Sequence, residues 1–253
     1  MADEIDTRIS PTLHPGIDGV IADYDADTRP LLGAAETAIS EAFEALKSIH
    51  EAKAGAAKNP TLNEYAQLVQ VDDYATKRMV GRVWPMWDRA RDTLDNNIAR
   101  FEQELRAPVE QRATGTMGSE IRAYFRGMEK ETQRFGALRQ AIAEGDDVTV
   151  TAVLGARPYL SGIDAETSEM LLQEWHERAQ PVKAKQLRAM KATAAIIAER
   201  EPLLKKSVQD AIGYIDEFKT SQVDGRPILA KRTSAREVRD QMRAAQKPFS
   251  VPV

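Results

Sequence analysis

The sequence contains no cysteine and only three histidines, His14, His50 and His176, among its 253 residues. Without cysteine the chain has no disulfide framework, thiolate zinc site, iron–sulfur cluster or cysteine nucleophile. Neither His50 nor His176 follows a glutamate by three residues, as the Glu-x-x-His pairs of dimetal helical bundles require. We therefore expect no metal site, no cofactor and no catalytic residues.

Long apolar runs are also missing. No stretch approaches the ~20 residues that cross a membrane, so we expect no membrane partner. The first ten residues, MADEIDTRIS, are acidic and do not follow the basic-then-apolar pattern of a secretion signal. The contents of 42% hydrophobic and 29% charged residues are those of a folded globular chain.

Motifs that bind phosphate or position a nucleophile are absent, including the P-loop, the dinucleotide fingerprint and the nucleophile elbow. The triplet Asp23-x-Asp25-x-Asp27 resembles the opening of a calcium-binding loop. Such a loop needs glycine at its sixth position and glutamate at its twelfth, where this chain has Thr28 and Ala34. The triplet therefore indicates an acidic segment and not a metal site.

Helical periodicity is the dominant pattern. Apolar residues recur at intervals of three and four from Leu32 to Ile49, again from Val80 to Leu105, and most regularly from Leu187 to Phe218. No convincing pair of strands is evident, so residues 147–162, which partly alternate, are read as a short helix. The sequence predicts an all-α fold: an elongated bundle of about five long helices over residues 30–224, with extended arms at both ends.

Prolines and glycines give the expected breaks. Pro85 lies inside a helical run and should kink it near Gly81, Pro108 should end that helix, and Pro181 should separate two further helices. Gly145 is placed to stop a helix in the left-handed conformation.

The two ends of the chain carry opposite charge. Residues 1–29 contain seven acidic residues and two basic ones, and they show no helical period, which indicates an extended acidic arm. Residues 225–253 contain seven basic residues and two acidic ones, and they predict a short basic helix followed by an extended tail. We expect these ends to bind partners through the acidic residues Asp23, Asp25 and Asp27 and the basic row Arg232, Arg236, Arg239, Arg243 and Lys247.

Two carboxylates, Glu131 and Glu201, fall on apolar helix faces that should exclude them. They are a catalytic pair, or ion-pair partners of a seam arginine such as Arg91, or partly exposed residues at the edge of the stripe. The sequence leaves these three alternatives open. Trp84 and Trp87 beside Pro85 are either a packed aromatic plug or a pocket opened by the kink.

Residues 141–181 contain Glu144-Gly-Asp, then Thr-Ala-Val-Leu, then Tyr-Leu-Ser-Gly162, followed by an amphipathic helix. This stretch resembles uncharacterised helical proteins encoded among the virion-structure genes of tailed bacteriophages. The resemblance implies that the protein takes part in a virion or in its assembly, and that it is located in a virion or in the bacterial cytoplasm. It assigns no functional residues.

Three functions remain open from the sequence. The first is a non-enzymatic structural or assembly protein that packs against copies of itself, or against other structural proteins, in a multicopy complex such as a bacteriophage particle. The second is a nucleic-acid-associated helical protein that uses the C-terminal arginine row. The third is an enzyme with a site in the bundle core, for which a buried pair of carboxylates is the sign to seek.

Overall fold

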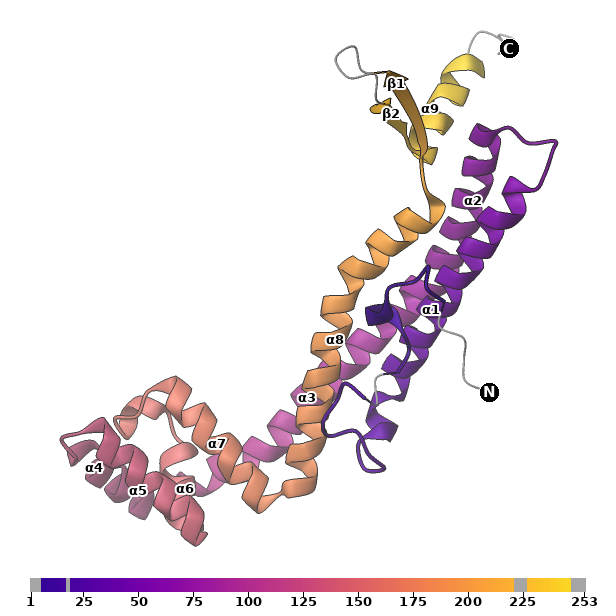
Figure 1. Cartoon of the computed structure of the whole chain (residues 1–253). Coiled ribbons are helices and arrows are strands. Elements are labelled where there is room, and N and C mark those ends of the chain that lie inside the picture. Colours follow the sequence, from indigo (N-terminus) through magenta and orange to yellow (C-terminus); the bar gives the residue numbers. More distant parts are fainter. Residues whose placement is uncertain (1–5, 17–18, 221–226, 247–253) are drawn as a thin grey trace, which may run out of the picture. The chain divides into compact units, whose positions relative to one another are not determined.

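A computed structural model describes residues 6–16, 19–220 and 227–246 (Figure 1). The chain divides into two compact units. Unit 1 comprises Met1–Ile17, Gly33–Arg91 and Ala195–Val253, and unit 2 comprises Asp18–Leu32 and Asp92–Ala194. The unit boundaries do not coincide with the expected ones at residues 29 and 224, and three of the four fall inside helices: α1 (Arg29–Ala57), α3 (Trp84–Arg112) and α8 (Pro181–Ile212).

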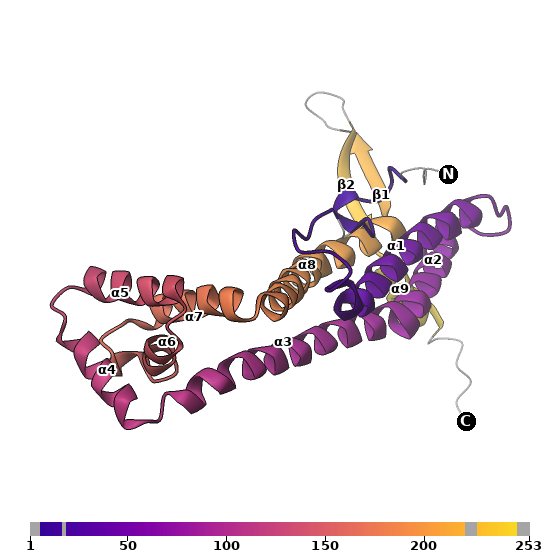
Figure 2. The same cartoon turned by 90° about the horizontal axis from the view of Figure 1, so that it is seen from below.

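The helical core of unit 1 follows the predicted stripes. α1 and α2 (Glu64–Arg78) lie side by side in Figures 1 and 2. The predicted α1 face is buried, and so is one apolar face of α2 and of the second half of α8. The fully buried side chains include Ile39, Leu46, Ile49, Ala75, Ile197, Leu204 and Ala211. The expectation of a mostly helical protein is confirmed, whereas the count of about five helices is not.

The helix irregularity expected near Gly81 is present as a π-helical turn, Met79–Val83, which connects α2 to α3. The Trp84 amide donates a hydrogen bond to the Met79 carbonyl, five residues back. Because Pro85 has no amide hydrogen, a regular helix would lose a backbone hydrogen bond at this position. The wider π-helical turn rearranges the backbone hydrogen bonds there. Pro108, by contrast, does not end the helix, since α3 continues to Arg112.

The C-terminal part of unit 1 corrects the all-helical expectation. α8 ends at Ile212, and the residues beyond it form an antiparallel hairpin of β1 (Ile215–Thr220) and β2 (Pro227–Thr233). Ile215 and Phe218 therefore belong to a strand and not to the long helical seam. The short basic helix is confirmed as α9 (Ala235–Gln246), which lies against α2, and the expected tail falls outside the described residues.

The described part of the N-terminal segment is folded rather than extended. Residues 6–16 contain a 3-10 turn, Pro11–Leu13, and bury Ile9 and Leu13. The Arg200 guanidinium donates to the His14 carbonyl at 3.1 Å, and the His14 ring meets Phe43 of α1 edge-on at 5.2 Å. This segment is anchored to the helices of unit 1, which corrects the extended arm.

Unit 2 is built around a short buried helix, α6 (Asp147–Leu154), as the sequence predicts for that stretch. α4 (Thr116–Gly127), α5 (Glu131–Glu144) and α7 (Ala165–Ala179) gather around it (Figure 2). Gly145 ends α5 at φ +75°, the predicted left-handed stop. α7 ends before Pro181, where α8 begins, so the predicted break is confirmed.

We predict that Leu13→Ala lowers the free energy of unfolding of unit 1 by about 2–3 kcal/mol, because it leaves a cavity where the side chain is now 4% exposed. Thr12→Ala, at the exposed neighbouring position, is the matched control and should change it by less than about 0.5 kcal/mol. Urea unfolding followed by circular dichroism measures both. Equal stabilities of the two variants would show that the segment does not pack as described.

Candidate functional site

The acidic residues of the N-terminal segment are held by basic residues of α8 within unit 2. Asp23 accepts hydrogen bonds from the Arg188 guanidinium at 3.0 and 3.3 Å. Lys185 donates to both Asp25 and Asp27 at 2.8 Å, and the Lys185 hydrogen bond lowers the pKa of Asp25. These three carboxylates, predicted to bind a partner, are therefore paired inside the chain.

A compact turn positions those carboxylates. The hydroxyl of the buried Thr28 donates to the Asp23 carbonyl at 2.7 Å and accepts from the Asp25 amide at 2.9 Å. The Arg29 amide, at the start of α1, donates to the Asp25 carbonyl at 2.9 Å. The spacing that resembled a calcium loop thus makes a turn that leads into a helix, with its carboxylates directed to cations of α8.

The C-terminal basic row does not lie on one helix face. Arg232 is on β2, where it makes a two-bond ion pair with Asp216 of β1 at 2.8 Å and lies 5.2 Å from the Tyr214 ring. Arg239 of α9 binds Asp72 and Asp73 of α2. Arg243 and Arg236 are exposed, Arg243 with a distant contact to Asp240 at 3.9 Å. Lys247 falls outside the described residues.

The structure instead brings two large apolar side chains together on the hairpin. Phe218 and Leu229 are direct cross-strand partners, and they are 61% and 49% exposed. We call this pair the hairpin face. Among the described residues the sheet has only these two strands, so the outer backbone edge of each is without a strand partner.

Sequence reasoning missed the hairpin face because Ile215 and Phe218 continue the three-and-four spacing of α8. A signal was available in the Asp224-Gly225 pair, which is a frequent hairpin turn between two runs with β-branched and aromatic residues. Gly213, directly after α8, was a second signal of a helix end.

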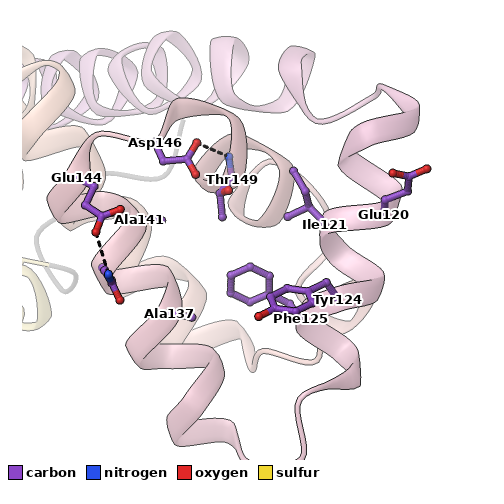
Figure 3. Close-up of a pocket in the computed structure, with 10 residues that line it drawn as sticks. Glu120, Ile121, Tyr124, Phe125, Ala137, Ala141, Glu144, Asp146 and Thr149 are labelled. Atoms are coloured by element: carbon purple, nitrogen blue, oxygen red, sulfur yellow. Dashed lines mark hydrogen bonds between the residues drawn. The ribbon is translucent and has the colours of Figure 1, made fainter.

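A shallow pocket of about 460 Å³ opens between α4, α5 and α6 in unit 2 (Figure 3). Ile121, Tyr124 and Phe125 form its apolar side. Two of its carboxylates have structural roles: Asp146 caps α6 by accepting from the Val148 and Thr149 amides, and Glu144 accepts from Gln140 at 2.8 Å. Asp146 and Glu144 are thus occupied by helix capping and helix-surface pairing.

A second pocket, of about 400 Å³, lies between α3, α7 and the first part of α8 in unit 2. Its charged residues pair with one another or with nearby groups: Arg106 with Glu169, Lys191 with Glu102, and Arg188 with Glu177. His176 borders it with 8% exposure. Burial lowers the pKa of the His176 imidazole, and a hydrogen bond to the Leu105 backbone opposes part of that effect.

The seam carboxylate Glu201 is an ion-pair partner, which confirms one of the three alternatives. Its carboxylate lies 3.5 Å from the Arg91 guanidinium and 2.6 Å from the Lys205 ammonium. Glu131 is exposed at the start of α5. Trp87 is fully buried, as the packed aromatic plug requires, and Trp84 lies under the Lys205 ammonium at 5.8 Å.

Within residues 6–16, 19–220 and 227–246, no three His, Asp or Glu side chains are grouped to hold a metal ion. None of the helices in those ranges combines the length and apolar character that crossing a membrane requires. No protein-family model, curated protein or solved structure matches this chain.

We predict that the stability of unit 2 falls as the pH drops below about 6.5, the ordinary pKa of histidine. The folded pKa of His176 is lowered, so the unfolded state binds the proton more readily and acid favours unfolding. Urea unfolding at pH 7.5 and 5.5 measures this loss.

The variant His176→Asn cannot take up that proton and should lose less stability over the same interval. His14→Asn is the matched control, because His14 lies in unit 1 and should leave the pH dependence of unit 2 unchanged. An identical pH dependence in His176→Asn and the wild type would contradict the assignment.

Proposed function

We propose that this chain is a non-enzymatic structural or assembly protein that packs against copies of itself, or against other structural proteins, in a multicopy complex such as a bacteriophage virion. The observation that carries the proposal is the hairpin face, where two large apolar side chains lie side by side and are exposed to solvent. Adjacent exposed apolar side chains form a patch, and exposed apolar patches are typical of protein interaction sites.

The chemistry of the hairpin suits a protein partner. Phe218 and Leu229 provide an apolar centre, and the Asp216–Arg232 ion pair, with Arg232 over Tyr214, lies farther along the same two strands. An apolar centre with a polar and aromatic border is the usual composition of a protein interface. The unpaired backbone edges of the strands add hydrogen-bonding groups that a strand from a partner can satisfy.

Other features support a scaffold rather than chemistry. The buried apolar side chains of both units lie mainly on helices, and the ion pairs named above join residues that are far apart in the sequence of each unit. The resemblance of residues 141–181 to helical proteins from virion-structure genes favours the particle context.

We predict that the wild-type protein self-associates at roughly 10 µM, the range of a micromolar dissociation constant. The double variant Phe218→Ser, Leu229→Ser should weaken association about tenfold or more, because each apolar side chain buried at an interface contributes on the order of 1.5–3 kcal/mol. Sedimentation velocity over a concentration series measures the change.

Tyr159→Ser is the matched control for that experiment, since Tyr159 is similarly exposed at 66% but lies in unit 2. It should associate as the wild type does. A wild-type chain that sediments as a monomer over the whole series would contradict the proposal.

The nucleic-acid alternative now depends on Arg236 and Arg243, which are seven residues apart and thus on one face of α9. Arg232 and Arg239 have carboxylate partners, so a nucleic-acid phosphate would have to displace them. If the alternative holds, wild-type protein should bind duplex DNA at low salt, and Arg236→Glu with Arg243→Glu should abolish binding. An absence of DNA binding by the wild type, measured by fluorescence anisotropy, disposes of it.

A further inference from the structure

Strands β1 and β2 and helix α9 form a small module that docks on α2 within unit 1. We call it the C-terminal module. Its apolar contact with α2 is a separate cluster in which Leu68 of α2 and Ala235 and Val238 of α9 are buried. Ile212 and Ile215 pack at its border.

A charged contact lies beside that cluster. The Arg239 guanidinium reaches Asp72 with one terminal nitrogen and Asp73 with the other. The Arg239 and Asp72 side chains are 28% and 20% exposed, so this part of the contact is largely shielded from water. α2 therefore presents an apolar and acidic docking surface, and α9 presents its complement.

The docking is limited in extent. Among the described residues, the apolar cluster between α9 and α2 buries three side chains, whereas the cluster of unit 2 buries twelve. On the β1 side, the Tyr65 hydroxyl of α2 donates a long hydrogen bond of 3.5 Å to the Glu217 carboxylate. A contact of this size can open without unfolding the helices beneath it.

The connection to the rest of unit 1 is suited to such opening. α8 ends at Ile212, and Gly213 has φ +86°, a left-handed conformation that glycine adopts without strain. The chain changes direction there before β1 begins. Small changes in the backbone angles of Gly213 can redirect the whole module.

We propose that the C-terminal module is exchanged between two copies of this chain, so that α9 of one copy docks on Leu68, Asp72 and Asp73 of the other. The occupant is a second copy because the complementary surface is already defined by the contact inside one chain. Exchange forms between two chains the same contacts that each chain makes within itself. Its free-energy cost is therefore mainly the entropic advantage that a contact within one chain has over a contact between two chains. That advantage disappears at the high local concentration of an assembly.

This inference rests on the proposed function and names the segment through which copies join. The hairpin face belongs to the exchanged module, so Phe218 and Leu229 move with it. Exchange would therefore bring them to the junction between copies.

Complementary charge reversal tests the exchange. Arg239→Glu places like charges at the docking surface of one variant, and Asp72→Lys with Asp73→Lys does so in another. In each variant by itself, α9 should dock poorly on α2 of the same chain. When the two variants are mixed, exchange pairs opposite charges at both contacts. We expect the 1:1 heterodimer to exceed the homodimer of either variant about tenfold or more in native mass spectrometry.

Two controls accompany the mixture. Arg236→Glu changes an exposed arginine of α9 by the same charge, and its mixture with Asp72→Lys, Asp73→Lys should give no enrichment. The triple variant that carries all three reversals in one chain should dock its own module again, seen as restored thermal stability. If the charge-reversed variants do not fold, a milder pair replaces them: Arg239→Gln in one chain, and Asp72→Asn with Asp73→Asn in the other. Mixing these two restores one of the two docking contacts, that between Arg239 of the second variant and the aspartates of the first.

Failure of the exchange is distinguishable from failure of the proposed function. If the mixture gives no heterodimer while the triple variant docks its own module, the exchange is overturned. If the wild type still self-associates through the hairpin face in that case, the proposed function stands. Heterodimer enrichment that also appears with Arg236→Glu would overturn the exchange as well, since it would not depend on the Arg239 contact.

Discussion

The ion pairs that join the charged ends of the chain to its own helices are the constraint on which the position of both ends depends. Arg188 and Lys185 hold the turn at residues 23–28, and Asp72 and Asp73 hold Arg239. Each pair links segments about 160 residues apart in sequence. Exposed pairs contribute little individually, about 0–1 kcal/mol, but these are grouped, and they lie beside buried side chains such as Thr28 and Val238.

The pairing of charged residues within the chain changes which groups at its two ends remain available to bind a partner. Had the ends extended freely, opposite charges would have been the natural contact between copies. With Asp23, Asp25, Asp27, Arg232 and Arg239 already paired, the C-terminal module presents the apolar hairpin face together with the two exposed arginines of α9. Assembly through Phe218 and Leu229 would then draw its free energy from burial, and it should depend on salt less than a contact between charged arms would.

The helices could be predicted from the sequence because their information is local. The stripe from Leu32 to Ile49, the break at Pro181 and the stop at Gly145 each depend on residues within a few positions of one another. The Arg91–Glu201 ion pair was one of the alternatives because a carboxylate on an apolar face needs a partner. The hairpin was missed because Ile215 and Phe218, three residues apart, continue the helical spacing of α8. Gly213 is the residue that ends the helix before them.

The paired ends could not be predicted for a different reason. Nothing local distinguishes an acidic segment in water from one whose partners lie on a helix 160 residues away. The same limit applies to the hairpin face, since its exposure depends on which side of β1 packs against the α2 cluster. The docking surface on α2 likewise exists only because Asp72 and Asp73 are brought to α9 by the fold.

Amide hydrogen exchange of the full chain tests the central claim most directly. If both ends are held by their own units, the backbone amides of residues 25–29 and of α9 should exchange at least about a hundredfold more slowly than in an unstructured peptide. Exchange of both segments at the unstructured rate, with the cores of the two units still protected, would contradict the account.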